Sequence, residues 1–259
     1  MTEALRHGRG KLDLGDLRGS YEFEVSQGNL LQAGGNVATQ ASLERERSMV
    51  AAIDQGLHRS PALRGSDHFE PKASLRTEQR LAVEAILASQ DFAINLRGAA
   101  GTGKTATLQE IDRGLHAAGH EVLAVAPTRS AVEELQKVGF GNSMTVSRLL
   151  EDQTAQQSHR GNVLIVDEAG MVSGRQMEGL LDLARREDAR ILFSGDTRQI
   201  QSVESSDALR ILERESRMTS VSLTGIQRQS NPDYRDAIET FREVTRSRLH
   251  QAARHGSRP

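Results

Sequence analysis

The eight residues GAAGTGKT, from Gly98 to Thr105, combine glycines with a lysine and a threonine in the spacing G-x-x-x-x-G-K-[ST]. Glycines let backbone N–H groups curl around an anion without interference from Cβ atoms, and a helix that starts there points its positive end at the same place. We expect Lys104 to reach the β and γ phosphates of a nucleotide and the Thr105 hydroxyl to hold Mg²⁺. A glycine turn with an incidental lysine is the alternative. The predicted nucleotide contacts in this stretch are Gly98, Ala99, Ala100, Gly101, Thr102, Gly103, Lys104, Thr105 and Ala106.

Two acids, Asp167 and Glu168, follow an apolar run in the stretch VLIVDEAGM. Hydrolysis of a phosphate needs one carboxylate that holds the metal and another that activates water. We expect Asp167 to bind Mg²⁺ through water and Glu168 to act as general base on the attacking water. The alternative is an acidic pair at a helix N-terminus, where negative charge is favourable.

A third polar cluster follows the apolar start of FSGDTRQIQSVE, where Asp196 and Gln199 come just after a candidate strand. Ligands bind at this carboxyl edge in open α/β sheets. The neutral amide of Gln199 can contact a terminal phosphate or the attacking water without competing as a base. An isolated glutamine is otherwise an ordinary surface residue.

Helices that alternate with short apolar strands must position these residues. LRTEQRLAVEAILAS predicts a helix opened by Thr77, with Leu81, Val83, Ile86 and Leu87 facing inward. Such alternation predicts an α/β fold with a parallel sheet that has helices on both faces. The candidate strands are 92–96, 121–126, 162–166, 190–193 and 221–223.

The two ends of the chain differ from this central part. Residues 1–70 are predicted to be an N-terminal extension and linker, in which Tyr21 to Val25 alternates like a strand and 41–57 has helical spacing. Residues 230–259 are predicted to form a C-terminal helix and a basic tail. The catalytic domain is therefore expected to span 71–229.

Composition narrows the class of protein. The 259 residues carry a net charge of −2 and no cysteine, which excludes disulfides and thiolate metal sites. No apolar run approaches the ~20 residues that span a bilayer, so we expect a soluble, cytoplasmic protein without a membrane partner. Global charge neither favours nor excludes a nucleic-acid partner, so local motifs must decide.

From about 75 to 229, these ordered motifs resemble the first motor domain of superfamily one DNA helicases, above all the RecD-like branch and the helicase part of conjugative relaxases of the TraI and TrwC type. The resemblance implies a RecA-like P-loop NTPase fold with ATP and Mg²⁺ as cofactors. Gln79 falls where that family reads the adenine edge. GDTRQIQSVE resembles the motif that couples the γ-phosphate to DNA, which gives Gln199 its role. In LTGIQRQ, Arg228 is the candidate that reaches the γ-phosphate; an exposed helix-cap arginine is the alternative.

The same resemblance implies single-stranded DNA as a partner, held by backbone contacts. APTRSAVEEL is similar to a family segment that grips DNA, with Thr128, Arg129 and Ser130 as matching residues. SMTVSRLL is similar to the next such segment, with Thr145 in register. Ser147 stands where RecD relatives often carry histidine.

The sequence thus favours the ATP-binding and ATP-hydrolysing motor domain of a DNA helicase, from a conjugative relaxase-helicase. Motifs of a second motor domain do not follow, so we expect weak turnover, no unwinding by this chain alone, and another chain that supplies that domain. Two alternatives remain: a nucleotide-dependent binding module with little hydrolysis, and a P-loop kinase for a small molecule.

Overall fold

The computed structural model describes residues 14–33, 36–65, 69–99, 101–158, 160–195 and 208–223. The chain forms two units, Met1–Thr224 and Gly225–Pro259, and the described residues all belong to the first. Several predictions lie outside the described residues: those for Ala100, Asp196, Gln199, Arg228 and the C-terminal helix with its basic tail.

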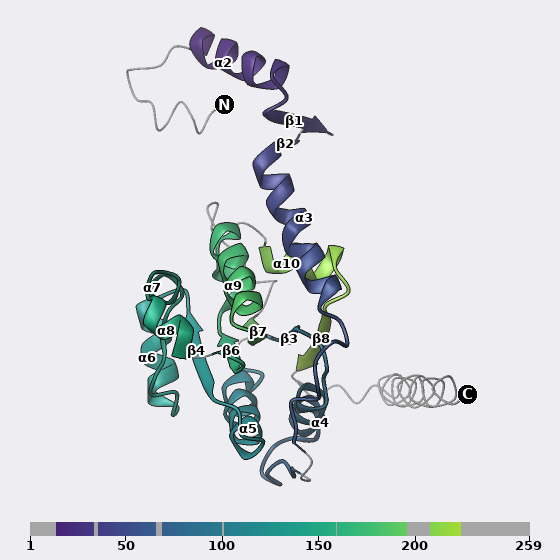
Figure 1. Ribbon diagram of the computed structural model, residues 1–259, viewed down its shortest axis with the longest axis vertical. Coiled ribbons are helices and arrows are strands. Elements are labelled where there is room, and N and C mark those ends of the chain that lie inside the picture. Colours follow the sequence, from purple (N-terminus) through teal and green to yellow (C-terminus); the bar gives the residue numbers. More distant parts are fainter. Residues whose placement is uncertain are drawn as a thin grey trace, which may run out of the picture. The chain divides into compact units, whose positions relative to one another are not determined.

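A six-stranded parallel sheet forms the centre of the first unit, in the order β5-β4-β6-β7-β3-β8 (Figure 1). One strand, β7, lies between the strand that leads to the glycines and the strand that leads to the two acids. Because all strands are parallel, both segments leave the sheet at the same edge. The strands are β3 (Ala93–Gly98), β4 (Val122–Ala126), β5 (Met144–Thr145), β6 (Val163–Val166), β7 (Arg190–Gly195) and β8 (Thr219–Leu223).

Helices cover both faces of this sheet, as the sequence predicts. Successive strand residues point to opposite faces, so Leu123 and Val125 join one buried cluster while Ala124 and Ala126 join the other. On the first face lie α7, α9 and α10, and on the second α4, α5 and α6 (Figure 1). Their bounds are α4 (Thr77–Leu87), α5 (Lys104–Ala117), α6 (Arg129–Lys137), α7 (Val146–Glu151), α9 (Gly174–Arg186) and α10 (Ala208–Glu215), with α8 (Gln153–Ser158) and the 3₁₀ turn η1 (Ala169–Met171) between α7 and α9.

The strand-like alternation at Tyr21 to Val25 is wrong as a prediction of structure, because these residues lie in helix α2 (Leu14–Ser26). Phe23, the central apolar residue of this alternation, is 61% exposed, so it does not pack into a core. An ion pair one helical turn apart, between Arg18 Nε and Glu22 Oε1 at 3.1 Å, supports the helix instead. Strand pairing begins later, in the antiparallel hairpin β1 (Leu30–Ala33) and β2 (Asn36–Thr39).

Helix α3 (Gln40–Gln55) lies within the predicted extension, yet it buries its apolar side in the same core as the sheet. Met49 and Ile53 are fully buried there, and α3 packs against α9 and α10. An ion pair between Arg45 Nε and Glu178 Oε2, 3.0 Å long, joins α3 to α9. Residues 40–55 therefore contribute to the packing of the sheet's first face.

Helix α4 confirms the predicted start at Thr77 but not every inward residue. Val83, Ile86 and Leu87 are buried, whereas Leu81 is 37% exposed. Gln79 is buried in its place, with 5% exposure. The helix turns a polar side chain inward because Gln79 finds hydrogen-bond partners in the loop that precedes α5.

The amino-terminal edge of the sheet is fixed by one arginine on β7. The Arg190 guanidinium donates to the backbone oxygens of Asp91 (2.9 Å), Pro61 (2.8 Å) and Ser89 (2.9 Å). The predicted linker is thus fastened to the sheet. The buried Asp91 carboxylate, just before β3, accepts a further bond from Thr219 Oγ1 on β8 at 2.7 Å.

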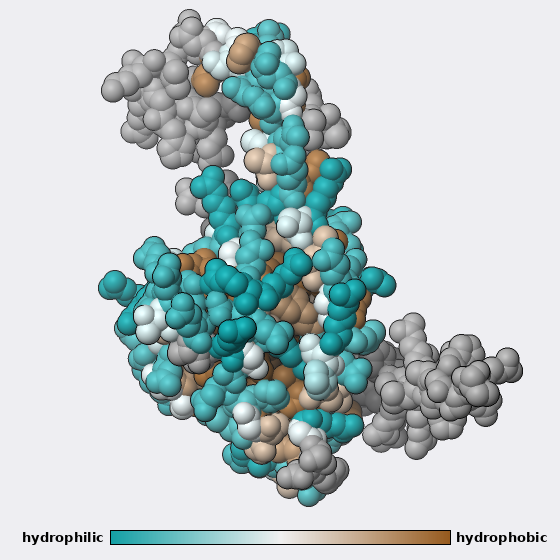
Figure 2. All heavy atoms as spheres, in the orientation of Figure 1, coloured by the Kyte–Doolittle hydropathy of each residue, from teal (hydrophilic) through white to brown (hydrophobic). Residues whose placement is uncertain are grey.

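Hydrophilic residues cover most of the face drawn in Figure 2, with smaller hydrophobic patches between them. Across the part of the chain that the structure describes, no helix has both the length and the hydrophobicity that crossing a bilayer requires.

Candidate nucleotide site

The glycine-rich loop runs from the end of β3 at Gly98 to the start of α5 at Lys104. Gly101 and Gly103 have φ angles of +77° and +87°, a region that residues with a Cβ rarely adopt. A Cβ on Gly98 would lie 2.5 Å from Thr102 Oγ1. Thr102 closes the turn, since its hydroxyl donates to the Ala99 carbonyl at 2.8 Å. Glycine is therefore required by backbone conformation or by close contact at three positions of this loop.

The first turn of α5 presents groups that suit phosphate. Its N-cap is Gly103, which has no side chain, so no capping group occupies the first-turn amides. Lys104 Nζ lies over the loop and donates to the carbonyls of Gly98 at 2.5 Å and Ala99 at 3.2 Å. Thr105 is exposed on the same turn. Left-handed glycines, a helix N-terminus and an ammonium group fit a polyphosphate.

The first acid, Asp167, is held at the end of β6 by the strands on either side. Its N–H donates to the Val125 carbonyl at 2.9 Å, and its Oδ1 accepts from Ser194 Oγ at 2.8 Å. Ser194 is fully buried near the end of β7. Sequence reasoning missed Ser194; the available signal was a polar residue directly after the apolar residues ILF. A carboxylate oriented in this way fits a Mg²⁺ site.

The second acid, Glu168, adopts a left-handed conformation with φ 50° and ψ 36°. Such a conformation costs a residue with a Cβ on the order of 1–3 kcal/mol and occurs most often at functional sites. Partial burial raises the pKa of Glu168, the neighbouring charge of Asp167 raises the pKa further, and Lys104 opposes both. The influence of Lys104 links this acid to the glycine loop across β7. A carboxylate that takes up a proton more readily than usual suits a general base.

Gln79 reaches the glycine loop from α4. Its Nε2 donates to the Gly103 carbonyl at 3.1 Å and to Thr107 Oγ1 at 3.4 Å. Its Oε1 accepts from the backbone N of Arg76 at 3.0 Å and from the Arg76 Nε at 3.3 Å. Both ends of the amide therefore contact the protein, and contact with an adenine edge stays a prediction.

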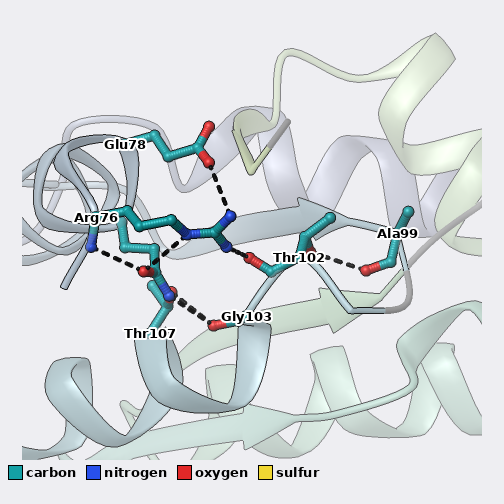
Figure 3. Close-up of polar contacts among 7 residues, drawn as sticks. Arg76, Glu78, Ala99, Thr102, Gly103 and Thr107 are labelled. Carbon is teal, nitrogen blue, oxygen red and sulfur yellow. Dashed lines mark hydrogen bonds and ion pairs between the residues drawn. The ribbon is translucent and has the colours of Figure 1, made fainter. Parts of the chain in front are cut away.

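Arg76 is a second site residue that sequence reasoning missed. Its guanidinium donates to the Thr102 carbonyl in the loop (Figure 3). It also donates to Gln79. The available signal was its position. It is the N-cap of α4, where serine, threonine, aspartate or asparagine is usual.

The four predicted DNA contacts come together at the carboxyl ends of β4 and β5. These strands pair in parallel, with Ala126 opposite Thr145. Thr128 caps α6, since its Oγ1 accepts from Ala131 N at 3.2 Å, and it lies 3.1 Å from Ser130 Oγ. Thr145 caps α7 by accepting from Arg148 N at 3.3 Å, while Arg129 and Ser130 are exposed on the first turn of α6. Ser147, the residue that departs from the RecD pattern, accepts from Gln176 Nε2 at 3.1 Å.

Strand β7 ends beside the turn that follows the two acids. Gly195 ends β7, and a Cβ there would lie 3.2 Å from Gly170 N and 3.3 Å from Ala169 N, in the turn that follows Glu168. Gln199 and Arg228 themselves lie outside the described residues. Their predicted contacts with the γ-phosphate stay predictions.

Comparison with known proteins places this chain in a family. A family profile described as "AAA domain" matches residues 74–257. The multifunctional conjugation protein TraI of Escherichia coli is 26% identical over 266 residues, which cover 95% of this chain and 15% of TraI. A probable conjugal transfer protein TraA of Sinorhizobium fredii is 32% identical over 146 residues, covering 56% of this chain and 13% of TraA.

Two helicases also match. The ATP-dependent RecD2 DNA helicase of Deinococcus radiodurans is 30% identical over 197 residues, covering 72% of this chain and 27% of RecD2. The crystal structure of the UvsW helicase from bacteriophage T4 aligns with 84% of this chain and 85% of its own, at 11% identity and a TM-score of 0.42.

The chain spans between 13% and 27% of the length of these curated relatives. The predicted resemblance to RecD-like helicases and to conjugative TraI is confirmed by these matches. With a profile match over most of its length and a phosphate loop in the expected place, the chain belongs to the AAA domain family.

Proposed function

We propose that this chain is the ATP-binding and ATP-hydrolysing motor domain of a DNA helicase, of the kind found in conjugative relaxase-helicases. One observation carries the proposal. The Lys104 loop and the Asp167–Glu168 pair leave the same sheet edge one strand apart, and Lys104 lies near enough to oppose the raised pKa of Glu168. Phosphoryl transfer to water needs those two groups on either side of one phosphate.

Each residue then has a defined task. The loop amides and Lys104 bind the β and γ phosphates. The Thr105 hydroxyl would hold Mg²⁺ directly, and Asp167 would hold it through water. When bound, Mg²⁺ neutralises charge on the phosphates. Ser194 keeps the Asp167 carboxylate in one orientation, and Glu168 takes the proton of the attacking water.

Single-stranded DNA is the proposed partner, gripped by its backbone at Thr128, Arg129, Ser130 and Thr145. Their position at one sheet edge and the names of the related helicases support this assignment. Backbone contacts are independent of sequence and sensitive to salt. Arg129→Ala should reduce the slope of log affinity against log salt by about 1. The matched control is Arg47→Ala, an exposed arginine on α3; equal slopes for all three proteins would remove Arg129 from the interface.

Turnover by the 259 residues alone should be slow. An arginine supplied from another domain or chain can contribute about 10³-fold or more to phosphoryl transfer. We propose that a second motor domain supplies such a charge and that unwinding requires it.

The decisive experiment measures ATP turnover with and without single-stranded DNA for the wild type, Lys104→Ala and Glu168→Gln. If DNA stimulates ATP turnover in the wild type and in neither variant, the result supports the motor domain. Binding of ATP with no turnover under either condition would make the chain a nucleotide-dependent binding module. Turnover only with an added metabolite would make it a small-molecule kinase.

A further inference from the structure

The start of α4 lies against the glycine loop, and Arg76 connects the two (Figure 3). The Arg76 guanidinium donates from Nε to Gln79 Oε1 at 3.3 Å and from its second terminal nitrogen to the Thr102 carbonyl. Its remaining terminal nitrogen lies 3.6 Å from Glu78 Oε1. All three nitrogens of this planar group therefore have a partner, which fixes the direction of the fork.

The two carbonyls that α4 contacts are consecutive. Arg76 donates to the oxygen of Thr102, and Gln79 Nε2 donates to the oxygen of Gly103. In a trans peptide, the carbonyl and the following N–H point in opposite directions within one plane. Holding the Thr102 oxygen toward α4 thus directs the N–H group of Gly103 away from it. The Gly103 oxygen, which also accepts from Thr107 N at 3.1 Å, directs the N–H group of Lys104 in the same way. Those are amides with which a phosphate loop binds its ligand.

The loop is built to admit this contact. A Cβ on Gly103 would lie 2.6 Å from Gln79 Nε2 and 3.0 Å from the Arg76 nitrogen that bonds to Thr102. Glycine at this position is needed for close approach as well as for its φ angle. The contact and the sequence of the loop therefore depend on each other.

Helix capping does not account for the arginine. A guanidinium has no acceptor, so it cannot satisfy the N–H groups of the first turn of α4. Gln79 Oε1 accepts from the Arg76 backbone instead, which any residue type except proline would allow. An arginine at an N-cap is a poor choice for the helix alone. Its contact with Thr102 supplies the missing reason.

A second attachment holds the segment that carries Arg76. The backbone N of Lys72 donates to the buried Glu110 Oε1 on α5 at 2.8 Å. Arg113, also on α5, donates to the Glu70 carbonyl at 2.8 Å and lies over the Phe69 ring. The chain from 69 to 79 is therefore anchored to α5 on one side of Arg76 and to the loop on the other.

We propose that Arg76 is a positioning residue, which orients the phosphate-binding amides of Gly103 and Lys104 before a nucleotide arrives. This inference rests on the proposed nucleotide site and deepens it. Arg76 acts on the polyphosphate through the loop backbone. Discrimination between adenine and guanine is left to other residues.

The test compares dissociation constants for ATP·Mg²⁺, GTP·Mg²⁺ and inorganic triphosphate in the wild type, Arg76→Ala, Arg76→Lys and the control Arg47→Ala. Arg76→Ala should weaken all three by a similar factor, about tenfold, the loss typical of a charged hydrogen bond. The ratio of ATP to GTP affinity should stay unchanged. Arg76→Lys should restore part of the loss, because an ammonium group can donate to Thr102 but lacks the fork that also reaches Gln79.

A measurement without nucleotide separates this inference from the proposed function. The ¹⁵N amide resonances of Gly103 and Lys104 should shift in nucleotide-free Arg76→Ala and less in Arg76→Lys. Unchanged affinities together with unchanged resonances would overturn the inference. A changed ratio of ATP to GTP affinity with unaltered triphosphate binding would also overturn it, because Arg76 would then act in recognition of the nucleobase. If the wild type binds none of the three ligands, the proposed function fails, while the amide resonances still test the positioning role. Should the alanine variant not fold, the lysine variant carries both measurements.

Discussion

Helices α5 and α6 both begin at the carboxyl edge of the sheet, but they begin in different ways. α6 starts with Thr128, whose hydroxyl accepts from a first-turn amide, and α7 and α9 start in the same way with Thr145 and Ser173. α5 starts with Gly103, which has no side chain with which to cap the helix. Its loop is held from outside by Arg76 and Gln79, through carbonyl oxygens.

The difference shows how the chain separates stability from binding. A capping hydroxyl satisfies an amide that water or a ligand would otherwise contact. At α6 and α7 that amide donates to the capping hydroxyl, which stabilises the helix. At α5 the proposed site leaves the amides to an anion, and the loop is held through the Thr102 and Gly103 carbonyls.

The largest effect is expected at Glu168, which the proposed function assigns to the chemical step and not to nucleotide binding. Glu168→Gln keeps the shape of the side chain but removes the base, so ATP turnover should fall by about 10²-fold or more. ATP affinity should stay close to that of the wild type. Turnover and a binding isotherm on the same sample check this. A variant that loses affinity and turnover together would place Glu168 among the binding residues.

Gly103→Ser gives α5 the kind of start that α9 has. We expect nucleotide affinity to fall at least about tenfold and stability to fall by about 1–3 kcal/mol, because serine is strained at a φ of +87° and would crowd Gln79. Gly119→Ala is the matched control. Its φ is +83°, with open space around the added Cβ, at the far end of α5. That control should show strain in thermal unfolding without loss of affinity; equal affinity losses would attribute the effect to global stability.

Glu110→Gln weakens the attachment of 69–79 to α5. Burial by itself raises the pKa of Glu110, but hydrogen bonds from Arg113 and the Lys72 backbone outweigh it and hold the pKa below the ordinary value of 4.5. The charged form therefore stabilises the fold above 4.5, and this contribution is lost as pH falls through the folded-state pKa. The variant should lose about 1–3 kcal/mol at neutral pH, with a gap to wild type that closes in acid. Chemical denaturation across that pH range checks it, and a constant gap would contradict it.

The smallest effect is expected at a capped helix. Thr128→Ala should lower the free energy of unfolding by about 1 kcal/mol, because the Ala131 amide loses its acceptor. Thr128→Ser keeps the hydroxyl and should behave like the wild type in stability. ATP affinity should be unchanged in both. A parallel loss of ATP affinity in the alanine variant would show that the two helix starts are not independent.

Sequence patterns predicted the buried strands and the order of the motifs, since a parallel strand buried on both faces reads as a continuous apolar run. The glycine loop, the acids and their common sheet edge follow from that order. The strand-like alternation at Tyr21 to Val25 misled because periodicity does not reveal whether a neighbouring surface exists to be covered. Strand β5 was missed because Met144–Thr145 is too short to show a period.

Contacts between distant segments were harder to predict. The inward turn of Gln79, in place of Leu81, depends on a loop 24 residues later in the chain. The bonds from Arg76 to Thr102 and from Ser194 to Asp167 likewise join residues on separate elements. Each polar residue looked ordinary alone, and only the fold shows which partner it meets.

A crystal structure with a non-hydrolysable ATP analogue and Mg²⁺ tests the central claim most directly. We predict that the triphosphate lies against the amides of Gly101 to Thr105, with Mg²⁺ between Thr105 and Asp167. Lys104 Nζ should exchange the Gly98 and Ala99 carbonyls for phosphate oxygens, while Arg76 stays on Thr102. A triphosphate bound elsewhere, or Lys104 still on those carbonyls beside a bound analogue, would contradict the account.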